Sequence, residues 1–256
     1  MSAGALAAHQ FAFDQRVFWR NPASVFFTVI FPLIFLFLFA GLFGNERIEE
    51  LGVSLATYYV PGIITLAVVS ATLVSLAMNL VIAREAGRLK RVRGTPLPTW
   101  AFIAGRVGNS IVVSVLMVAL VTLLGAVFFG VEVPTKTLPA LLVTLLLGAF
   151  AFCSLGFALS SVIPSEDAAP AITNATVLPL YFLSGVFIPE SEIPQGILDV
   201  AGVFPIRPLF EAFFAGFDPT TSGAGFELGS LAVVAAWGVA GLLFALRRFR
   251  WAPRAD

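Results

Sequence analysis

Six long stretches without a charged residue constrain the fold of this chain more than any other feature. They cover residues 21–44, 51–83, 107–131, 137–165, 168–189 and 228–246. A helix that crosses a bilayer needs about 20 predominantly apolar residues. Trimming at Pro, Gly and polar clusters predicts spans near 23–43, 58–82, 100–129, 138–162, 168–187 and 228–246. The stretches lack the alternating pattern of a membrane β-barrel. We therefore predict an all-α polytopic membrane protein with six transmembrane helices, forming a single domain over residues 1–256.

The composition agrees with a membrane protein. Hydrophobic residues make up 59% of the chain and charged residues only 12%, which leaves too little polar surface to coat a soluble globule. The formal net charge is zero, with 15 basic and 15 acidic residues, so the total charge indicates no nucleic-acid partner.

The basic residues are distributed unevenly around the predicted spans. With the N-terminus in the cytoplasm, 12 of the 15 fall on the cytoplasmic side: Arg16, Arg20, Arg84, Arg88, Lys90, Arg91, Arg93, Arg106, Arg247, Arg248, Arg250 and Arg254. Ten of the 15 acidic residues fall on the other side. Because loops rich in Lys and Arg stay in the cytoplasm, we expect both termini to be cytoplasmic.

The segments outside the spans also carry patterns. Residues 1–20 contain Phe11, Phe13, Phe18 and Trp19, which favour an N-terminal interfacial helix. Residues 188–227 are too apolar for a free loop and are divided by prolines into pieces shorter than a span. Short re-entrant helices that dip into the outer leaflet fit this segment, and an amphipathic surface loop is the alternative.

The sequence PSEDAAP, residues 164–170, is typical of a helix start. Ser165 can cap the helix, Glu166 and Asp167 favour its positive end, and Pro170 fits the first turn. Capping explains both acids without a catalytic role. Their predicted cytoplasmic position also makes them available to a partner.

Residues for catalysis or metal binding are few. No G-x-x-x-x-G-K-[ST] phosphate loop occurs, and the sole histidine and cysteine, His9 and Cys153, cannot form a Ser–His pair or a metal cluster within a span. We therefore expect no metal site and no enzyme activity in this chain by itself. Neutral polar residues within the spans could line a substrate pathway or form interhelical hydrogen bonds: Ser75, Asn79, Asn174 and Tyr181.

The stretch REAGRLKRVRG, residues 84–94, places five basic residues and Glu85 between two apolar segments. A cytoplasmic loop explains the basic residues. Ala86, Leu89 and Val92 recur every three positions, and Gly94-Thr95-Pro96 would end a helix. The stretch therefore predicts a short amphipathic helix parallel to the membrane.

Two segments resemble the ABC-2 type permeases, especially drug-exporter permeases of the daunorubicin-resistance type. The first resembles the pattern R-E-x-x-G-x-L-[KR]-x-x-x-x-x-P-[LV], with Arg84, Glu85, Gly87, Leu89, Lys90 and Pro96 at the matching positions, although the Glu-to-Gly spacing is one residue shorter than in many members. The second resembles the outer segment of the family, with Ser184, Gly185, Pro189, Pro194 and Pro205. The likeness extends from about residue 9 to residue 248. Arg207 departs from the family pattern, which often places an arginine nearer the last helix.

The resemblance implies the membrane half of a transporter. Separate ABC ATPase subunits would bind ATP and Mg²⁺, so this chain would hold no cofactor, and a second permease copy or homologue would complete the pore. A cytoplasmic coupling helix between spans two and three would contact the ATPase through Arg84, Glu85, Arg88, Leu89, Lys90 and Arg91, with Glu166 and Asp167 as further candidates. Outer re-entrant helices containing Gly185, Pro189, Pro194 and Pro205 would gate the external side.

The family also implies a biological setting. It indicates a multi-pass protein of a prokaryotic plasma (inner) membrane that exports an amphiphilic substrate such as a drug, an antibiotic or a lipid-like molecule. The alternative is a carrier or channel that acts alone and is not driven by ATP. The lack of acidic residues inside the predicted spans weighs against it.

Overall fold

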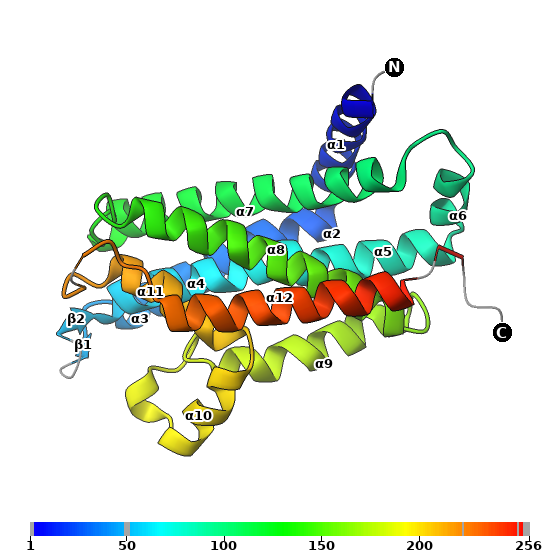
Figure 1. Ribbon diagram of the computed structural model, residues 1–256. Helices are drawn as coiled ribbons and strands as arrows, with labels where there is room; N and C mark the ends of the chain where they lie inside the picture. Colours follow the sequence, from blue (N-terminus) through cyan, green and yellow to red (C-terminus); the bar gives the residue numbers. More distant parts are fainter. Residues whose placement is uncertain (1–2, 49–51, 222, 250, 253–256) are drawn as a thin grey trace.

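Long apolar helices lying side by side form the body of the computed structural model, which describes residues 3–48, 52–221, 223–249 and 251–252 (Figure 1). Among these residues, five helical stretches are long and apolar enough to cross a membrane: Pro22–Phe43, Leu55–Glu85, Thr99–Phe129 (α7), Leu138–Val162 (α8) and Leu228–Arg248 (α12). The protein is therefore mostly helical, as predicted for an all-α polytopic membrane protein.

The predicted fifth span is shorter in the structure than in the sequence. The helix α9 covers Ala168–Leu183, which is 16 residues rather than the predicted 168–187. It ends there because Ser184 leaves the helix and Gly185 has a φ of 78°, a left-handed conformation that glycine adopts without strain. At about 1.5 Å per residue, α9 is shorter than the ~30 Å hydrocarbon core of a bilayer.

The first two spans each contain a π-helical segment. The first consists of α2 (Pro22–Val25), η1 (Phe26–Ile30) and α3 (Phe31–Phe43), and the second of α4 (Leu55–Val69), η2 (Ser70–Val74) and α5 (Ser75–Glu85). The two π-helical segments contact each other in the bundle. Each inserts an extra residue into a helical turn, and such insertions occur frequently at functional sites.

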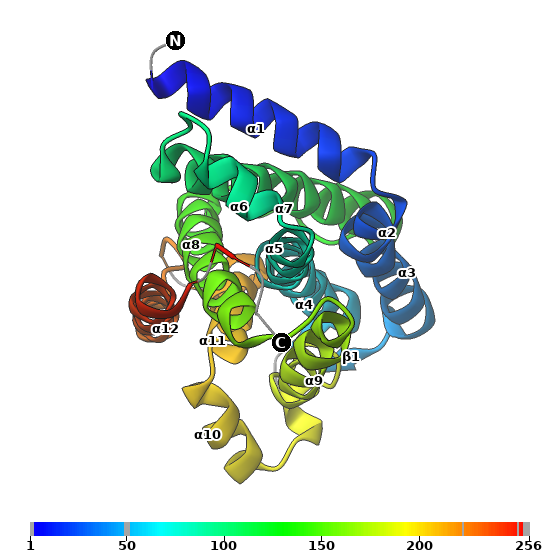
Figure 2. The same ribbon diagram turned by 90° about the vertical axis from the view of Figure 1, so that its right-hand side faces the viewer.

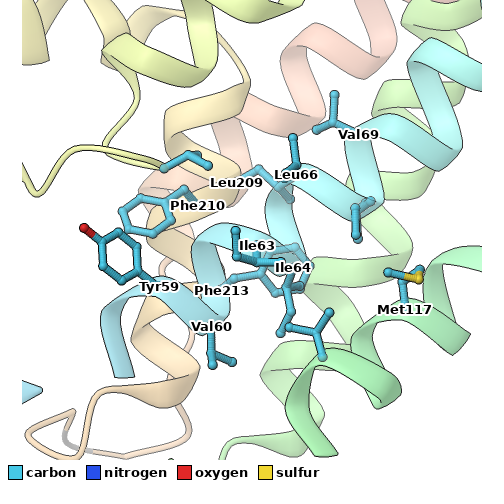
Figure 3. Packing of buried hydrophobic residues seen from close by; sticks show 14 of the residues in the cluster. Tyr59, Val60, Ile63, Ile64, Leu66, Val69, Met117, Leu209, Phe210 and Phe213 are labelled. Carbon is cyan, nitrogen blue, oxygen red and sulfur yellow. The ribbon is translucent and has the colours of Figure 1, made fainter. Parts of the chain in front are cut away.

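The core surrounds α4, which is buried over almost its whole length. Figure 3 shows Ile63 of α4 close to Leu209 and Phe213 of α11 (Ile206–Phe217), with Met117 of α7 on another side of α4. Ile63, Leu209, Phe213 and Met117 are all fully buried. Because α11 is surrounded by α4, α8 and α12, it belongs to the bundle and is not part of a free loop.

The N-terminal helix α1 (Ala3–Trp19) lies across the bundle against α7 (Figure 2). Close packing is possible because Gly105 of α7 faces Gln10 and Asp14, and Gly108 faces Phe11. A helix is thus present where an interfacial helix was predicted. Its position relative to a membrane stays a prediction.

Several shorter elements lie toward one end of the bundle. A two-stranded hairpin, β1 (Arg47–Ile48) and β2 (Val53–Ser54), precedes α4. Between α9 and α12 lie the 3₁₀ turn η3 (Glu190–Glu192), α10 (Gln195–Val203) and α11. Figure 1 shows α10 protruding from the bundle below α12. The short helices predicted for residues 188–227 are present, and their depth in a bilayer stays a prediction.

Candidate functional site

An elbow joins α5 to the short helix α6 (Arg88–Arg93) at the end of the bundle opposite β1 and β2 (Figure 1). The α5 helix ends at Glu85, and Gly87 takes a φ of 66° between the two helices. The predicted short helix is therefore present as α6, but it covers only residues 88–93, and residues 84–87 lie outside it. Ala86 lies in the turn and is exposed, so it does not share a helical face with Leu89 and Val92.

Arg84 is buried at this elbow, with 2% of its surface exposed. Its Nη1 donates a hydrogen bond to the Ser160 carbonyl oxygen at 2.8 Å, and its Nη2 donates to the Ile163 carbonyl oxygen at 2.7 Å. These carbonyls lie at the C-terminal end of α8, where backbone acceptors lack helical partners and a positive charge is favourable. Arg84 therefore joins α5 to the end of α8.

Glu85 accompanies Arg84 and is half-buried. Its Oε1 lies 2.7 Å from Arg84 Nε, so the carboxylate balances the charge of the guanidinium. Within the described residues, Arg84 and Glu85 bond to each other, and Arg84 bonds to the end of α8. A role for either residue in coupling to a partner stays a prediction.

The helix α6 has one buried and one exposed side. Leu89 is 1% exposed and belongs to a cluster of apolar side chains that includes Phe102 of α7 and Phe157 of α8. Arg88, Lys90, Arg91 and Arg93 are exposed. The helix thus presents a basic surface while Leu89 holds it against the bundle.

Glu166 and Asp167 lie at the same end of the molecule as α6, in the turn between α8 and α9 (Figure 1). Both are exposed. Ser165 Oγ accepts a hydrogen bond from the Ala168 N–H at 3.3 Å, which agrees with the predicted helix start. The turn with Glu166 and Asp167 follows Ile163, whose carbonyl oxygen accepts a hydrogen bond from Arg84. Since Arg84 lies at the end of α5, just before α6, its guanidinium links this acidic turn to the start of the basic helix.

At the opposite end, the loop after α9 packs tightly on α4. The Tyr58 hydroxyl donates a hydrogen bond to the Gly185 carbonyl oxygen at 2.8 Å. A Cβ atom at Gly62 would lie 2.8 Å from the Val186 carbonyl oxygen, so glycine permits this approach. Of the predicted gate residues, Gly185 forms the turn, and Pro189, Pro194 and Pro205 directly precede η3, α10 and α11.

Arg207 connects α11 with the turn η3, a contact that was not among the predictions. Its Nε lies 2.8 Å from Glu211 Oε1, and its Nη2 lies 3.5 Å from Glu190 Oε2. The Ser230 hydroxyl of α12 donates to Glu211 Oε2 at 2.8 Å. Burial raises the pKa of the Glu190 carboxyl above its usual range, although Arg207 opposes this effect. The i, i+4 spacing of Arg207 and Glu211 on one helix was the available signal.

The four predicted pathway residues do not form one polar surface. Ser75 and Asn79 bond to each other within α5, where Asn79 Nδ2 donates to the Ser75 carbonyl oxygen at 2.7 Å. Asn174 is exposed on α9. Tyr181 is buried and donates to the Leu66 carbonyl oxygen at 3.3 Å, one turn before η2. A role for these residues in transport stays a prediction.

A comparison with known protein families identifies the family of this chain. The model of the ABC-2 type transporter family matches residues 10–217. The chain belongs to the ABC-2 type transporter family. Membership makes this ABC-2 chain a membrane component of an ABC transporter.

Curated relatives agree with this assignment. The ABC-2 chain is 27% identical over 194 residues to the inner membrane transport permease YadH of Escherichia coli K12, covering 74% of this chain and 75% of the relative. It is 27% identical over 207 residues to the putative transport permease ycf38 of Porphyra purpurea, covering 78% and 70%. It is 30% identical over 191 residues to the daunorubicin resistance ABC transporter permease protein DrrB1 of Streptomyces coeruleorubidus, covering 72% and 66%.

The described residues of this ABC-2 chain offer little reactive chemistry. They contain no group of three or more His, Cys, Asp or Glu side chains that could hold a metal ion. Cys153 is buried in α8. What the structure provides instead is a buried mechanical link between α5 and α8 beside an exposed basic helix.

Proposed function

We propose that this ABC-2 chain is the permease subunit of an ATP-driven exporter and that separate ATPase subunits dock on α6. The Arg84 link carries the proposal. The exposed basic helix α6 is joined at Gly87 to the end of α5, where the Arg84 guanidinium holds α5 to α8. This arrangement can transmit movement from a partner into the bundle. ATP and Mg²⁺ would be bound by the partner.

The proposed topology has six crossings and cytoplasmic termini. The chain passes along the bundle in alternating directions, and α9 carries it from the end with α6 to the end with α10 (Figure 1). The basic residues Arg88, Lys90, Arg91, Arg247 and Arg248 then lie at one end of the bundle, as expected for the cytoplasmic side. In this arrangement α9, with the loop that follows it, is a shortened fifth span.

The proposed coupling depends on a difference in free energy between two states. An ATPase that binds α6 more tightly in one nucleotide state shifts the permease toward the matching conformation. Movement of α6 would act through Leu89 on the apolar cluster beneath it and through Arg84 on the end of α8. The acidic turn at Glu166 and Asp167 would provide a second contact with the ATPase.

The proposed cargo is amphiphilic and moves outward across a prokaryotic inner membrane. The names of two relatives support this proposal, since one is a daunorubicin resistance permease and another an inner membrane permease. We further propose that two permease chains pair to enclose the pathway, since the four pathway residues do not share one surface within a chain: Asn174 is exposed and Tyr181 is buried.

Reconstitution with the partner ATPase tests the proposal. We expect the triple variant Arg88→Ala, Lys90→Ala, Arg91→Ala to remain in the membrane but to lose co-purification of the ATPase and ATP-driven export. The Lys136→Ala variant is the control, because Lys136 is also basic and exposed but lies in the loop at the opposite end of the bundle. Full export by the triple variant would refute the proposal. Transport in liposomes without any ATPase would instead support a carrier or channel that acts alone.

A further inference from the structure

A cavity of about 500 Å³ lies between α7, α8 and α12, and it shares Phe157 with the apolar cluster against which α6 packs. Its walls include Ile103 and Val107 of α7, Phe157 of α8, and Leu242 and Leu246 of α12. Leu246 is 73% exposed, so the cavity opens on the outer surface of the bundle. Figure 2 shows α12 and α3 at opposite edges of the bundle, which places the cavity on the α12 edge.

The walls of the cavity suit hydrocarbon. Apolar side chains dominate them, and the Ser154 hydroxyl, one of the few polar groups, already donates to the Phe150 carbonyl oxygen at 2.8 Å. Cys153 at the inner wall is 2% exposed and sits among apolar neighbours. A ligand that needs hydrogen bonds would find few partners here, whereas a flexible acyl chain would gain from burial.

The mouth of the cavity has the residues of a membrane interface. Trp100 at the start of α7 lines the cavity and is 52% exposed, and Trp251 lines it after the end of α12. Tryptophan favours the headgroup region of a bilayer. Arg247 and Arg248, in the last turn of α12, are exposed and make no ion pair with the described residues. Exposed arginines next to a membrane surface attract anionic lipid headgroups.

We propose that this cavity binds one acyl chain of an anionic phospholipid from the bilayer, with the phosphate held at the level of Arg247 and Arg248. The lipid would belong to the cytoplasmic leaflet, and this assignment rests on the proposed topology. The cavity lies at the α12 edge of the bundle, and Arg247 and Arg248 lie in the chain between two of its lining residues, Leu246 and Phe249. The two arginines favour an anionic phospholipid over a neutral hydrophobic ligand.

The proposed lipid would also affect α6. Trp251 contacts Phe102 and Phe249, with ring centroids 5.5 and 5.4 Å apart, and these residues belong to the cluster in which Leu89 of α6 is buried. An acyl chain against Phe249 and Trp251 would therefore support the surface on which α6 rests. Anionic lipid should raise the efficiency of coupling by stabilising the position of α6.

Quenching of tryptophan fluorescence by brominated phospholipids tests binding on the purified chain without an ATPase. Trp19→Phe and Trp237→Phe leave Trp100 and Trp251 as the reporters in nanodiscs. We expect half-maximal quenching at a several-fold lower mole fraction of dibrominated phosphatidylglycerol than of dibrominated phosphatidylcholine. Equal mole fractions would overturn the proposal, and because no ATPase is present, this outcome is independent of whether the chain is an exporter.

Variants in the same background locate the site. Ala104→Phe should fill the cavity and abolish the preference for phosphatidylglycerol, while Ala232→Phe, an exposed position on α12 near its other end, should preserve it. Arg247→Gln with Arg248→Gln should also abolish the preference, and Arg247→Lys with Arg248→Lys should restore it. A preference that survives Ala104→Phe, or one that is lost equally in Ala232→Phe, would overturn the assignment to this cavity.

Discussion

Arg84 at the end of α5 donates through Nη1 to the carbonyl oxygen of Ser160 at the end of α8, over a distance of 2.8 Å. The second and fourth long helices are therefore held together at one end by a buried guanidinium. Removal of a buried donor leaves its acceptors without partners, which destabilises a protein by about 1–3 kcal/mol for each such group.

The Arg84→Ala variant should consequently lower the thermal stability of the permease and weaken the coupling of ATP hydrolysis to transport. Arg84→Lys keeps the charge, but a single ammonium group cannot bond to both carbonyls as the forked guanidinium does. Its thermal stability and coupling should therefore lie between those of Arg84→Ala and those of the native chain. Size-exclusion thermostability in detergent measures the first effect. Arg93→Ala is the control, because Arg93 is basic but exposed. Equal stability of Arg84→Ala and Arg93→Ala would contradict a structural role of Arg84.

Gly87 sets the angle between α5 and α6. Its φ of 66° is unfavourable for residues with a Cβ, and a Cβ at this position would meet no atom within 4 Å. The expected effect of Gly87→Ala is therefore backbone strain alone, about 1–2 kcal/mol. We expect reduced coupling of ATPase activity to export in Gly87→Ala, and less reduction in Gly87→Asn, since asparagine tolerates the left-handed region. Gly94→Ala, at a φ of −82°, should behave as the native chain.

Much of the architecture was predictable because charged residues and turn formers delimit the apolar helices. The helix α8 covers the same residues, 138–162, as the predicted fourth span. The break at Gly87 was missed because the repeat of Ala86, Leu89 and Val92 implied one continuous helix. Glycine at such a position favours a break, but periodicity alone cannot distinguish a break from a tolerated glycine.

The contacts of the charged side chains could not be predicted from sequence. Arg84 was expected to contact an ATPase, and nothing local indicates that it points back to carbonyls 76 and 79 residues away. Arg207 likewise contacts Glu190, which the fold brings close to it, in addition to Glu211 one helical turn away. The π-helical segments η1 and η2 depend on how neighbouring helices pack, which the sequence of one helix does not reveal.

Gly156 of α8 allows α8 to pack directly on η2. A Cβ atom at Gly156 would lie 3.1 Å from the Thr72 carbonyl oxygen and 3.2 Å from that of Leu73. We expect Gly156→Ala to force the two helices apart and to destabilise the protein by about 1–3 kcal/mol, as overpacking typically does. Thermal unfolding in detergent measures this change. Gly41→Ala is the matched control, because a Cβ there would meet no atom within 4 Å; a similar loss in both variants would exclude close packing as the cause.

Arg207 should stabilise the segment formed by η3, α10 and α11. Without its charge, Glu190 and Glu211 would repel each other, and the pKa of Glu190 would rise further. Because both carboxylates are about one-third exposed, we expect Arg207→Gln to destabilise this segment by only about 1–2 kcal/mol. Hydrogen–deuterium exchange should then increase in α10 and α11 and not in α8. Arg207→Lys should restore part of the protection, and unchanged exchange in Arg207→Gln would show that the pairs do not hold the segment.

Asp14 and Arg106 form the polar part of the contact between α1 and α7. Asp14 is 2% exposed, its Oδ1 lies 3.4 Å from Arg106 Nε, and its Oδ2 accepts from Gln10 Nε2 at 3.0 Å. Burial raises the pKa of the Asp14 carboxyl, and this effect exceeds the opposing one of the Arg106 guanidinium. The docked helix therefore favours the protonated form of Asp14 relative to a helix exposed to water.

Docking of α1 should accordingly depend on pH in a defined direction. Because the pKa of Asp14 is raised in the docked state, Asp14 contributes fully to the stability of docking when the pH is below its ordinary pKa of 3.8. This contribution is lost as the pH rises through the pKa of the docked state. Spin labels at positions 8 and 112, in a Cys153→Ala background, report the distance between α1 and α7. We expect the distribution of this distance to broaden as the pH rises over this window. Asp14→Asn cannot ionise, so its distance distribution should be independent of pH. The same pH response in both proteins would show that another group controls the position of α1.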